Sequence, residues 1–144
     1  MGKDEFVGTW RLVSFEMRRS DGQIVYPFTR NIVGVLNYDA GGNMSAQLMR
    51  PDRPAFAAND HMRGTSEEIK AAFEGYISYF GTYEVNKEKG TVTHHVKGSL
   101  LPNWVGSDQV RFFELSGNRL TLRTPPIQAG GITVTSLLIW ERMA

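Results

Sequence analysis

The feature that most constrains this chain is a long first strand followed by a succession of shorter strands that tight turns join. Residues 8–19 read Gly-Thr-Trp-Arg-Leu-Val-Ser-Phe-Glu-Met-Arg-Arg and begin with a Gly-x-Trp step. Side chains of a strand alternate between two faces, and this segment alternates for long enough to run the height of a small barrel. We expect the strands that follow to wrap around Trp10.

The later strands are separated by short turns, which join antiparallel neighbours. Asp21-Gly22 between apolar runs is a strong hairpin signal. The strands predicted after the first are residues 24–26, 33–39, 44–49, 81–86, 91–97, 109–115, 119–124 and 132–142. A meander this long usually closes to avoid exposed edges, and eight strands leave room for one small ligand. The sequence therefore predicts an all-β fold, an antiparallel up-and-down barrel of eight or nine strands; a sheet curled open around a helix is the alternative.

One helix interrupts the predicted meander. Residues 65–68, Thr-Ser-Glu-Glu, supply a capping hydroxyl and two carboxylates that favour the positive end of a helix dipole. Apolar side chains then recur at spacings of three and four, at Ile69, Ala72, Phe73, Tyr76 and Ile77. The spacing predicts a helix over residues 66–78, placed where it can cap the open mouth of a barrel.

Composition excludes several classes of function. The 144 residues form a single predicted domain, residues 1–144, and their formal charge of +1 gives no electrostatic reason to expect nucleic acid or an anionic membrane as a partner. There is no cysteine, which excludes disulfides, thiol catalysis and thiolate metal sites. No apolar segment has the length of a signal-peptide core or a membrane span. We therefore expect a cytoplasmic, unanchored protein, with a homo-oligomer left open.

A set of segments in a fixed order carries a family resemblance. The segments are Gly8-Thr9-Trp10-Arg11-Leu12, Tyr38-Asp39-x-x-Gly42, Tyr83-Glu84-Val85, Val92-Thr93-His94-His95-Val96, Pro102-Asn103-Trp104-Val105-Gly106, Val110-Arg111-Phe112, Leu120-Thr121-Leu122 and Trp140-Glu141-Arg142. They resemble the bacterial and fungal lipocalin-like domain family of the calycin superfamily. The resemblance implies that Gly8 and Trp10 form the closed end and that Arg142 lies across the indole, a contact of about 1 kcal/mol. It implies little about function, because most members have no assigned activity and others lie among natural-product pathway genes.

Alternation predicts which side chains face the cavity. On the first strand, the predicted inner set is Trp10, Leu12, Ser14 and Glu16. On the hairpin of residues 81–97 it is Tyr83, Val85, Val92, His94 and Val96. On the hairpin of residues 109–124 it is Arg111, Phe113, Leu115, Leu120 and Leu122. The predicted ligand-binding residues are Ser14, Glu16, Tyr83, His94, Arg111, Phe113 and Trp104. Trp104 is expected either to rim the mouth or to pack as a lid on the helix.

Arg111 and His94 carry the chemistry of this interior. An inward Arg is costly unless paired, so Arg111 should meet Glu16, Glu84, a Tyr oxygen or a ligand carboxylate. Its plainer interpretation is a structural ion pair or a place at the mouth; its functional one is an anchor for a carboxylate or phenolate. His94 is most simply a hydrogen-bonded wall residue, with general acid/base catalysis, assisted by Tyr83 or Glu84, as the alternative.

A metal or cofactor is not expected. His94 and His95 are adjacent, so on a strand they face opposite ways and are poorly placed to share one metal ion. His61 is the remaining histidine, and the chain has no cysteine.

Three functional hypotheses follow from these residues. The first is a binding protein for a small, largely apolar ligand, with or without a carboxylate or phenolate group. The second is a cofactor-free isomerase, cyclase or hydratase in which His94 is the acid/base and Arg111 with Tyr83 stabilises an enolate-like oxygen. The third is a filled structural or oligomerising barrel. A cavity favours the first two, and a carboxylate converging with His94 and Arg111 would favour the enzyme.

Overall fold

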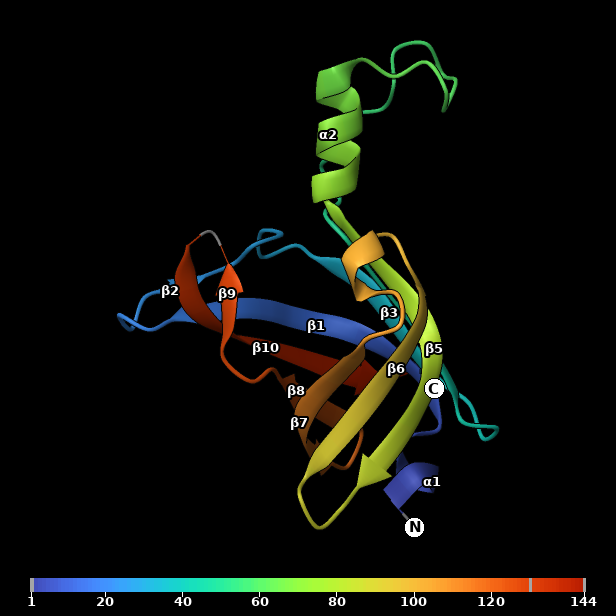
Figure 1. The fold of residues 1–144 in the computed structure, drawn as a ribbon, viewed down its shortest axis with the longest axis vertical. Coiled ribbons are helices and arrows are strands. Elements are labelled where there is room, and N and C mark those ends of the chain that lie inside the picture. Colours follow the sequence, from blue (N-terminus) through green and yellow to red (C-terminus); the bar gives the residue numbers. More distant parts are fainter. Residues whose placement is uncertain (1, 130, 144) are drawn as a thin grey trace.

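The computed structural model describes residues 2–129 and 131–143, and its strands close into a barrel (Figure 1). The strands are β1 (Gly8–Arg19), β2 (Ile24–Val25), β3 (Val33–Tyr38), β4 (Asn43–Met49), β5 (Tyr76–Asn86), β6 (Thr91–Ser99), β7 (Asp108–Ser116), β8 (Arg119–Arg123), β9 (Ile127–Ala129) and β10 (Ile132–Arg142). The ring runs β1-β3-β4-β5-β6-β7-β8-β10, and β10 pairs with β1 to close it. All of these pairings are antiparallel, so the predicted barrel is confirmed. The short strands β2 and β9 add to β1 and β10 outside the ring.

A bulge in β1 decides which side chains of that strand face inward. Leu12 lies opposite Trp140 while Ser14 lies opposite the next residue, Ile139, so one extra residue, Val13, is accommodated in β1. An extra residue shifts the alternation by one position. The inner face therefore continues from Trp10 and Leu12 to Phe15 and Met17, which both line the barrel cavity. The prediction that Ser14 and Glu16 share the inner face of Trp10 is wrong for this reason.

The closed end of the barrel is sealed by a short helix and by Trp10. Helix α1 (Gly2–Phe6) inserts Phe6, which is fully buried, edge-on against Tyr38 and Phe113 with ring centroids 5.4 and 4.9 Å away. The indole Nε1 of Trp10 donates to the Phe6 carbonyl at 2.9 Å. Aromatic edge-to-face packing and a satisfied indole N–H are what a buried cluster of this kind requires.

Arg142 lies over Trp10, as predicted. Its guanidinium carbon is 4.2 Å from the indole centroid. Its two terminal nitrogens donate to the carbonyls of Val7 and Glu5, each at 2.6 Å. A cation over an indole shields the ring from water, and the two hydrogen bonds tie the end of β10 to the chain entering β1.

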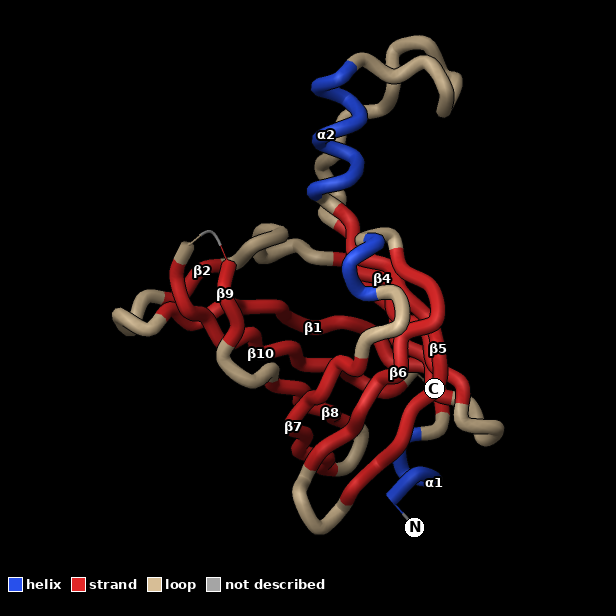
Figure 2. Tube along the Cα trace, viewed as in Figure 1, coloured by secondary structure: helices blue, strands red, loops and turns tan. Residues whose placement is uncertain are grey.

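The inserted helix is shorter than predicted and stands away from the barrel. Helix α2 (Ser66–Glu74) begins with a capping box, in which Thr65 and Glu68 satisfy each other's backbone N–H groups. Residues 76–78, predicted as helix, instead begin β5, because the ladder with β4 supplies their backbone partners. Figures 1 and 2 show α2 and the loop before it projecting beyond the ends of β4 and β5, and none of its residues is buried. The helix therefore does not cap the barrel mouth.

No helix in the described part of the chain combines the length and the apolar character needed to cross a membrane.

Candidate functional site

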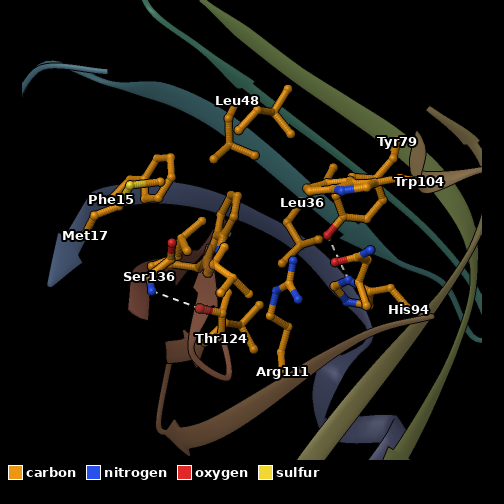
Figure 3. A pocket seen from close by; sticks show the side chains of 17 residues that line it. Phe15, Met17, Leu36, Leu48, Tyr79, His94, Trp104, Arg111, Thr124 and Ser136 are labelled. Carbon is orange, nitrogen blue, oxygen red and sulfur yellow. Dashed lines mark hydrogen bonds between the residues drawn. The ribbon is translucent and has the colours of Figure 1, made fainter. Parts of the chain in front are cut away.

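The barrel encloses a cavity of about 160 Å³ above the closed end (Figure 3). Its walls are mainly apolar and include Phe15, Leu36, Leu48 and Trp140. The polar side chains that also line it are Tyr79, His94, Gln109, Arg111, Thr124 and Ser136. A cavity of about 150 Å³ accepts benzene, so this space matches one aromatic ring with small substituents.

His94 forms the centre of a buried hydrogen-bonded chain. On β6 it lies opposite Tyr83 of β5 and Gln109 of β7, and its side chain is almost fully buried. Its Nε2 is 2.7 Å from the Tyr38 hydroxyl, and its Nδ1 is 2.9 Å from the Tyr79 hydroxyl. Burial, helped by the charge of Arg111, lowers the pKa of His94 from 6.5 to about 3. The imidazole is therefore neutral at pH 7, with one nitrogen as donor and the other as acceptor.

The surroundings fix the direction of this chain. Tyr38 is buried below the cavity, and its hydroxyl has no hydrogen-bond partner other than His94 among the described residues. If it accepted from Nε2–H, its own proton would stay unsatisfied at a cost of about 1–3 kcal/mol. Tyr38 therefore donates to Nε2, and Nδ1–H donates to the oxygen of Tyr79. The O–H of Tyr79 is then left to point to the cavity.

Both tyrosines keep their protons. Burial raises the pKa of Tyr38 well above its ordinary value, with the neighbouring Tyr79 adding to the shift. Burial also raises the pKa of Tyr79, against the opposing charge of Arg111. At neutral pH the Tyr79 hydroxyl is therefore a hydrogen-bond donor to whatever occupies the cavity.

Arg111 brings a positive charge to the same wall without a carboxylate partner. No described carboxylate lies within 4.0 Å of its guanidinium. Its Nη1 donates to the Val110 carbonyl at 3.0 Å, and its side chain also forms a hydrogen bond with the Tyr79 hydroxyl, which is the contact with a Tyr oxygen that the sequence offered. The carboxylates predicted as its partners are engaged elsewhere: Glu16 pairs with Arg18 at 2.8 Å and Glu84 with His95 at 2.6 Å. Arg111 and Tyr79 thus present N–H and O–H donors to one end of the cavity (Figure 3).

Trp104 links this end of the cavity to the barrel mouth. It ends a short 3₁₀ helix, η1 (Pro102–Trp104), and its ring meets Tyr79 edge-on at 5.4 Å. It lines the cavity and also an outer cleft shared with Phe28 and Phe73. The predicted position at the rim of the mouth agrees with this placement.

The sequence and the fold of this chain are similar to those of known proteins. A family model described as a lipocalin-like domain matches residues 7–143. The chain belongs to the lipocalin-like domain family. The 4'-hydroxy-3'-methoxypropiophenone carrier protein ppsC of Aspergillus oryzae (strain ATCC 42149 / RIB 40) is 36% identical to this lipocalin-like domain over 107 residues, 69% of the present chain and 96% of that protein. A crystal structure of a lipocalin-like protein from Bacteroides uniformis ATCC 8492 is similar with a TM-score of 0.49 and 15% identity, covering 96% of this chain and 99% of the other.

The remaining predicted site residues of the lipocalin-like domain lie outside the cavity lining. Ser14 and Glu16 lie on the other face of β1 because of the bulge. Tyr83 and Phe113 face inward, but they belong to the packed layer at the closed end. The Tyr83 hydroxyl donates to the Asp39 carbonyl at 2.8 Å, and its ring packs on Tyr38. The place predicted for Tyr83 beside Arg111 is occupied by Tyr79.

His95 points away from the cavity, as predicted. Its Nδ1 is 2.7 Å from Asp108 and its Nε2 is 2.6 Å from Glu84, so three neighbouring strands of the lipocalin-like domain meet at this side chain. Hydrogen bonds that the His95 ring donates to the Asp108 and Glu84 carboxylates raise the pKa of His95 above its ordinary value. Within the described chain, no three His, Asp or Glu side chains are grouped as ligands for a metal ion.

Four polar cavity residues were missed by the sequence analysis: Tyr79, Gln109, Thr124 and Ser136. Tyr79 fell between the predicted helix and the predicted strand, although the Tyr-x-Gly-x-Tyr pattern of residues 79–83 alternates as a strand does. Thr124 and Ser136 are small hydroxyl residues within strand-like segments, and nothing in their spacing distinguishes them from ordinary strand positions.

Proposed function

We propose that this lipocalin-like domain binds and carries a small aromatic molecule with a phenolate or carboxylate group, whose oxygen is held by Arg111. The observation that carries the proposal is the unpaired cation in a mainly apolar cavity. Arg111 is partly buried beside apolar walls and has no counter-charge among the described residues, so an anionic ligand oxygen would stabilise it. The planar guanidinium suits the two-oxygen face of a carboxylate and also the single oxygen of a phenolate.

Two further observations support this ligand class. The cavity has room for about one ring, and Tyr79 offers a second donor next to Arg111. The relative from Aspergillus oryzae is named as a carrier of 4'-hydroxy-3'-methoxypropiophenone, a compound with one ring and a phenolic hydroxyl. We extend the carrier role, and a phenolic ligand, to the present chain on this basis.

Binding accounts for the site better than catalysis does. His94 and Arg111 share the cavity wall, but no described carboxylate converges with them. Both nitrogens of His94 are engaged by tyrosines, and its low pKa makes it a weak base. We further expect the carrier to act in the cytoplasm, without a cofactor, and we leave its oligomeric state open.

The test is a titration with 4-nitrophenol, whose phenolate form absorbs visible light and whose neutral form does not. Near the pKa of the free phenol, we expect the wild-type domain to increase the phenolate band, because Arg111 stabilises the anion. Arg111→Met should abolish this increase and weaken binding about 10- to 100-fold, the range expected for hydrogen bonds to a charged group. The matched ligand 4-nitroanisole cannot ionise, so its affinity should change less than threefold.

Each alternative result has a definite meaning. Equal affinity and equal absorbance for wild type and Arg111→Met would show that Arg111 does not anchor the anion. If the wild type binds neither 4-nitrophenol nor 4-nitroanisole, the proposal that the cavity takes a single aromatic ring is overturned.

A further inference from the structure

Two hydroxyl groups at another part of the cavity wall have unused hydrogen-bonding capacity. Ser136 lies in β10, and Thr124 directly follows β8; both are about 95% buried. The Ser136 N–H donates to Thr124 Oγ1 at 2.9 Å, and the Thr124 N–H donates to the Ser136 carbonyl at 3.0 Å. Among the described residues, Ser136 Oγ has no hydrogen-bond partner and the Thr124 O–H has no acceptor.

Both hydroxyls belong to residues that line the cavity, so their unused hydrogen-bonding capacity is open to whatever occupies it. A hydroxyl that is covered by an apolar group without gaining a partner costs free energy. The indole N–H of Trp140, on the same inner face of β10, is likewise buried without a described partner. This region of the cavity therefore offers hydrogen bonds that the described side chains do not use.

The barrel places these hydroxyls across the cavity from Tyr79. In the closed ring of eight strands, β5 and β10 are separated by four steps in either direction, so they form opposite walls. Tyr79 is on β5 and Ser136 on β10, with Arg111 on β7 between them. Figure 3 shows Ser136 and Thr124 on one side of the cavity, Tyr79 and His94 on the other, and Arg111 between the two groups.

We propose that Ser136, supported by Thr124, is a second polar subsite that binds a carbonyl or hydroxyl oxygen on the far substituent of the ligand. The inference rests on the proposed function and narrows its ligand class to phenols with a second oxygen across the ring. The first oxygen meets Arg111 and Tyr79, and the second accepts a hydrogen bond from the Ser136 hydroxyl. A purely apolar substituent leaves that hydroxyl unsatisfied, which is the basis of discrimination.

The test compares 4-hydroxyacetophenone with 4-ethylphenol by isothermal titration calorimetry. The two probes share the phenol and a two-carbon para substituent, and they differ in the carbonyl oxygen. Ser136→Ala removes only Oγ and keeps the backbone hydrogen bond to Thr124. We expect it to weaken 4-hydroxyacetophenone about 5- to 10-fold, as for one buried hydrogen bond, and to change 4-ethylphenol less than twofold. Ser116→Ala makes the same change at an exposed position outside the cavity lining and should leave both affinities within twofold of wild type.

The outcomes separate this inference from the proposed function. If Ser136→Ala weakens both probes equally or neither, while the wild type binds both, the subsite is refuted and the proposed function stands. If Arg111→Met lowers the affinity for neither probe, the anchor at Arg111 is refuted. A selective effect of Ser136→Ala would still support the subsite. A wild type that binds neither probe overturns both. As a control for folding, Ser136→Ala should have the same melting temperature as the wild type, which would show that the barrel of the variant is intact.

Discussion

Burial of His94 makes the stability of this barrel depend on pH in a predictable way. The pKa of His94 is about 3 in the folded chain and 6.5 in the reference state. Above pH 6.5 the imidazole is neutral in both the folded and the unfolded chain, so it causes no pH dependence there. Below pH 6.5 the unfolded chain binds a proton that the folded chain refuses, so stability falls as the pH falls toward 3.

The size of the effect follows from the two pKa values. Between them, each pH unit costs about 1.4 kcal/mol of unfolding free energy. From pH 7 to pH 5 the integrated loss is about 2 kcal/mol, since the first half unit lies above the unfolded pKa. A domain of this kind has roughly 5–15 kcal/mol of stability in total, so the loss is measurable.

The assay is urea unfolding, followed by tryptophan fluorescence at pH 7 and pH 5, for wild type and His94→Gln. The Gln amide can accept from Tyr38 and donate to Tyr79, but it does not titrate. We expect the wild type to lose about 2 kcal/mol more than the variant between the two pH values. His95, whose pKa is raised, stabilises the fold below pH 6.5 and less so as the pH rises through its folded pKa; it is present in both proteins and cancels. Equal pH dependence in the two proteins would refute the argument.

Two further predictions concern the closed end and the strand pairing. Arg142→Met removes the cation over Trp10 and two hydrogen bonds to backbone carbonyls, so urea unfolding should show a loss of about 2 kcal/mol, and a loss below about 0.5 would contradict this. Gly81→Ala would place a Cβ 1.9 Å from the His95 carbonyl oxygen, so the pairing of β5 and β6 must shift, at about 3 kcal/mol or more. Gly90→Ala, at φ +67° with nothing within 4 Å, is the control and should cost about 1 kcal/mol; similar melting temperatures for the two variants would contradict the clash.

Most of the barrel could be predicted because its turns are local signals. Each tight turn joins neighbours in space, so the order of strands follows the order of the chain. The exceptions have nonlocal causes. The helix was predicted to reach residue 78, but in the structure it ends at Glu74. Pairing with β4 outweighs the helical periodicity in the residues that follow. Helix α1 is too short to form by itself and depends on the burial of Phe6, which no local pattern reveals.

The candidate site could be predicted only in part, because alternation was counted through a bulge. Arg111 and His94 were placed correctly, since their strands have no bulge between the turn and the site. On β1, the apolar residues change from even positions at Trp10 and Leu12 to odd positions at Phe15 and Met17. That change in phase is the sequence signal of the bulge.

The same bulge explains why Arg111 has no carboxylate partner among the described residues. With an unbroken alternation, Glu16 would share the inner face of Leu12, and a carboxylate would enter the same interior as the guanidinium. The inserted residue Val13 turns Glu16 outward, where it pairs with Arg18, and brings the apolar side chain of Met17 to the cavity instead. A barrel that neutralised its own cation would have little need of an anionic ligand. Without the extra residue in β1, the carboxylate of Glu16 would face the same interior as Arg111. With it, the Arg111 guanidinium has no described carboxylate beside it, and we expect its charge to be available to a ligand.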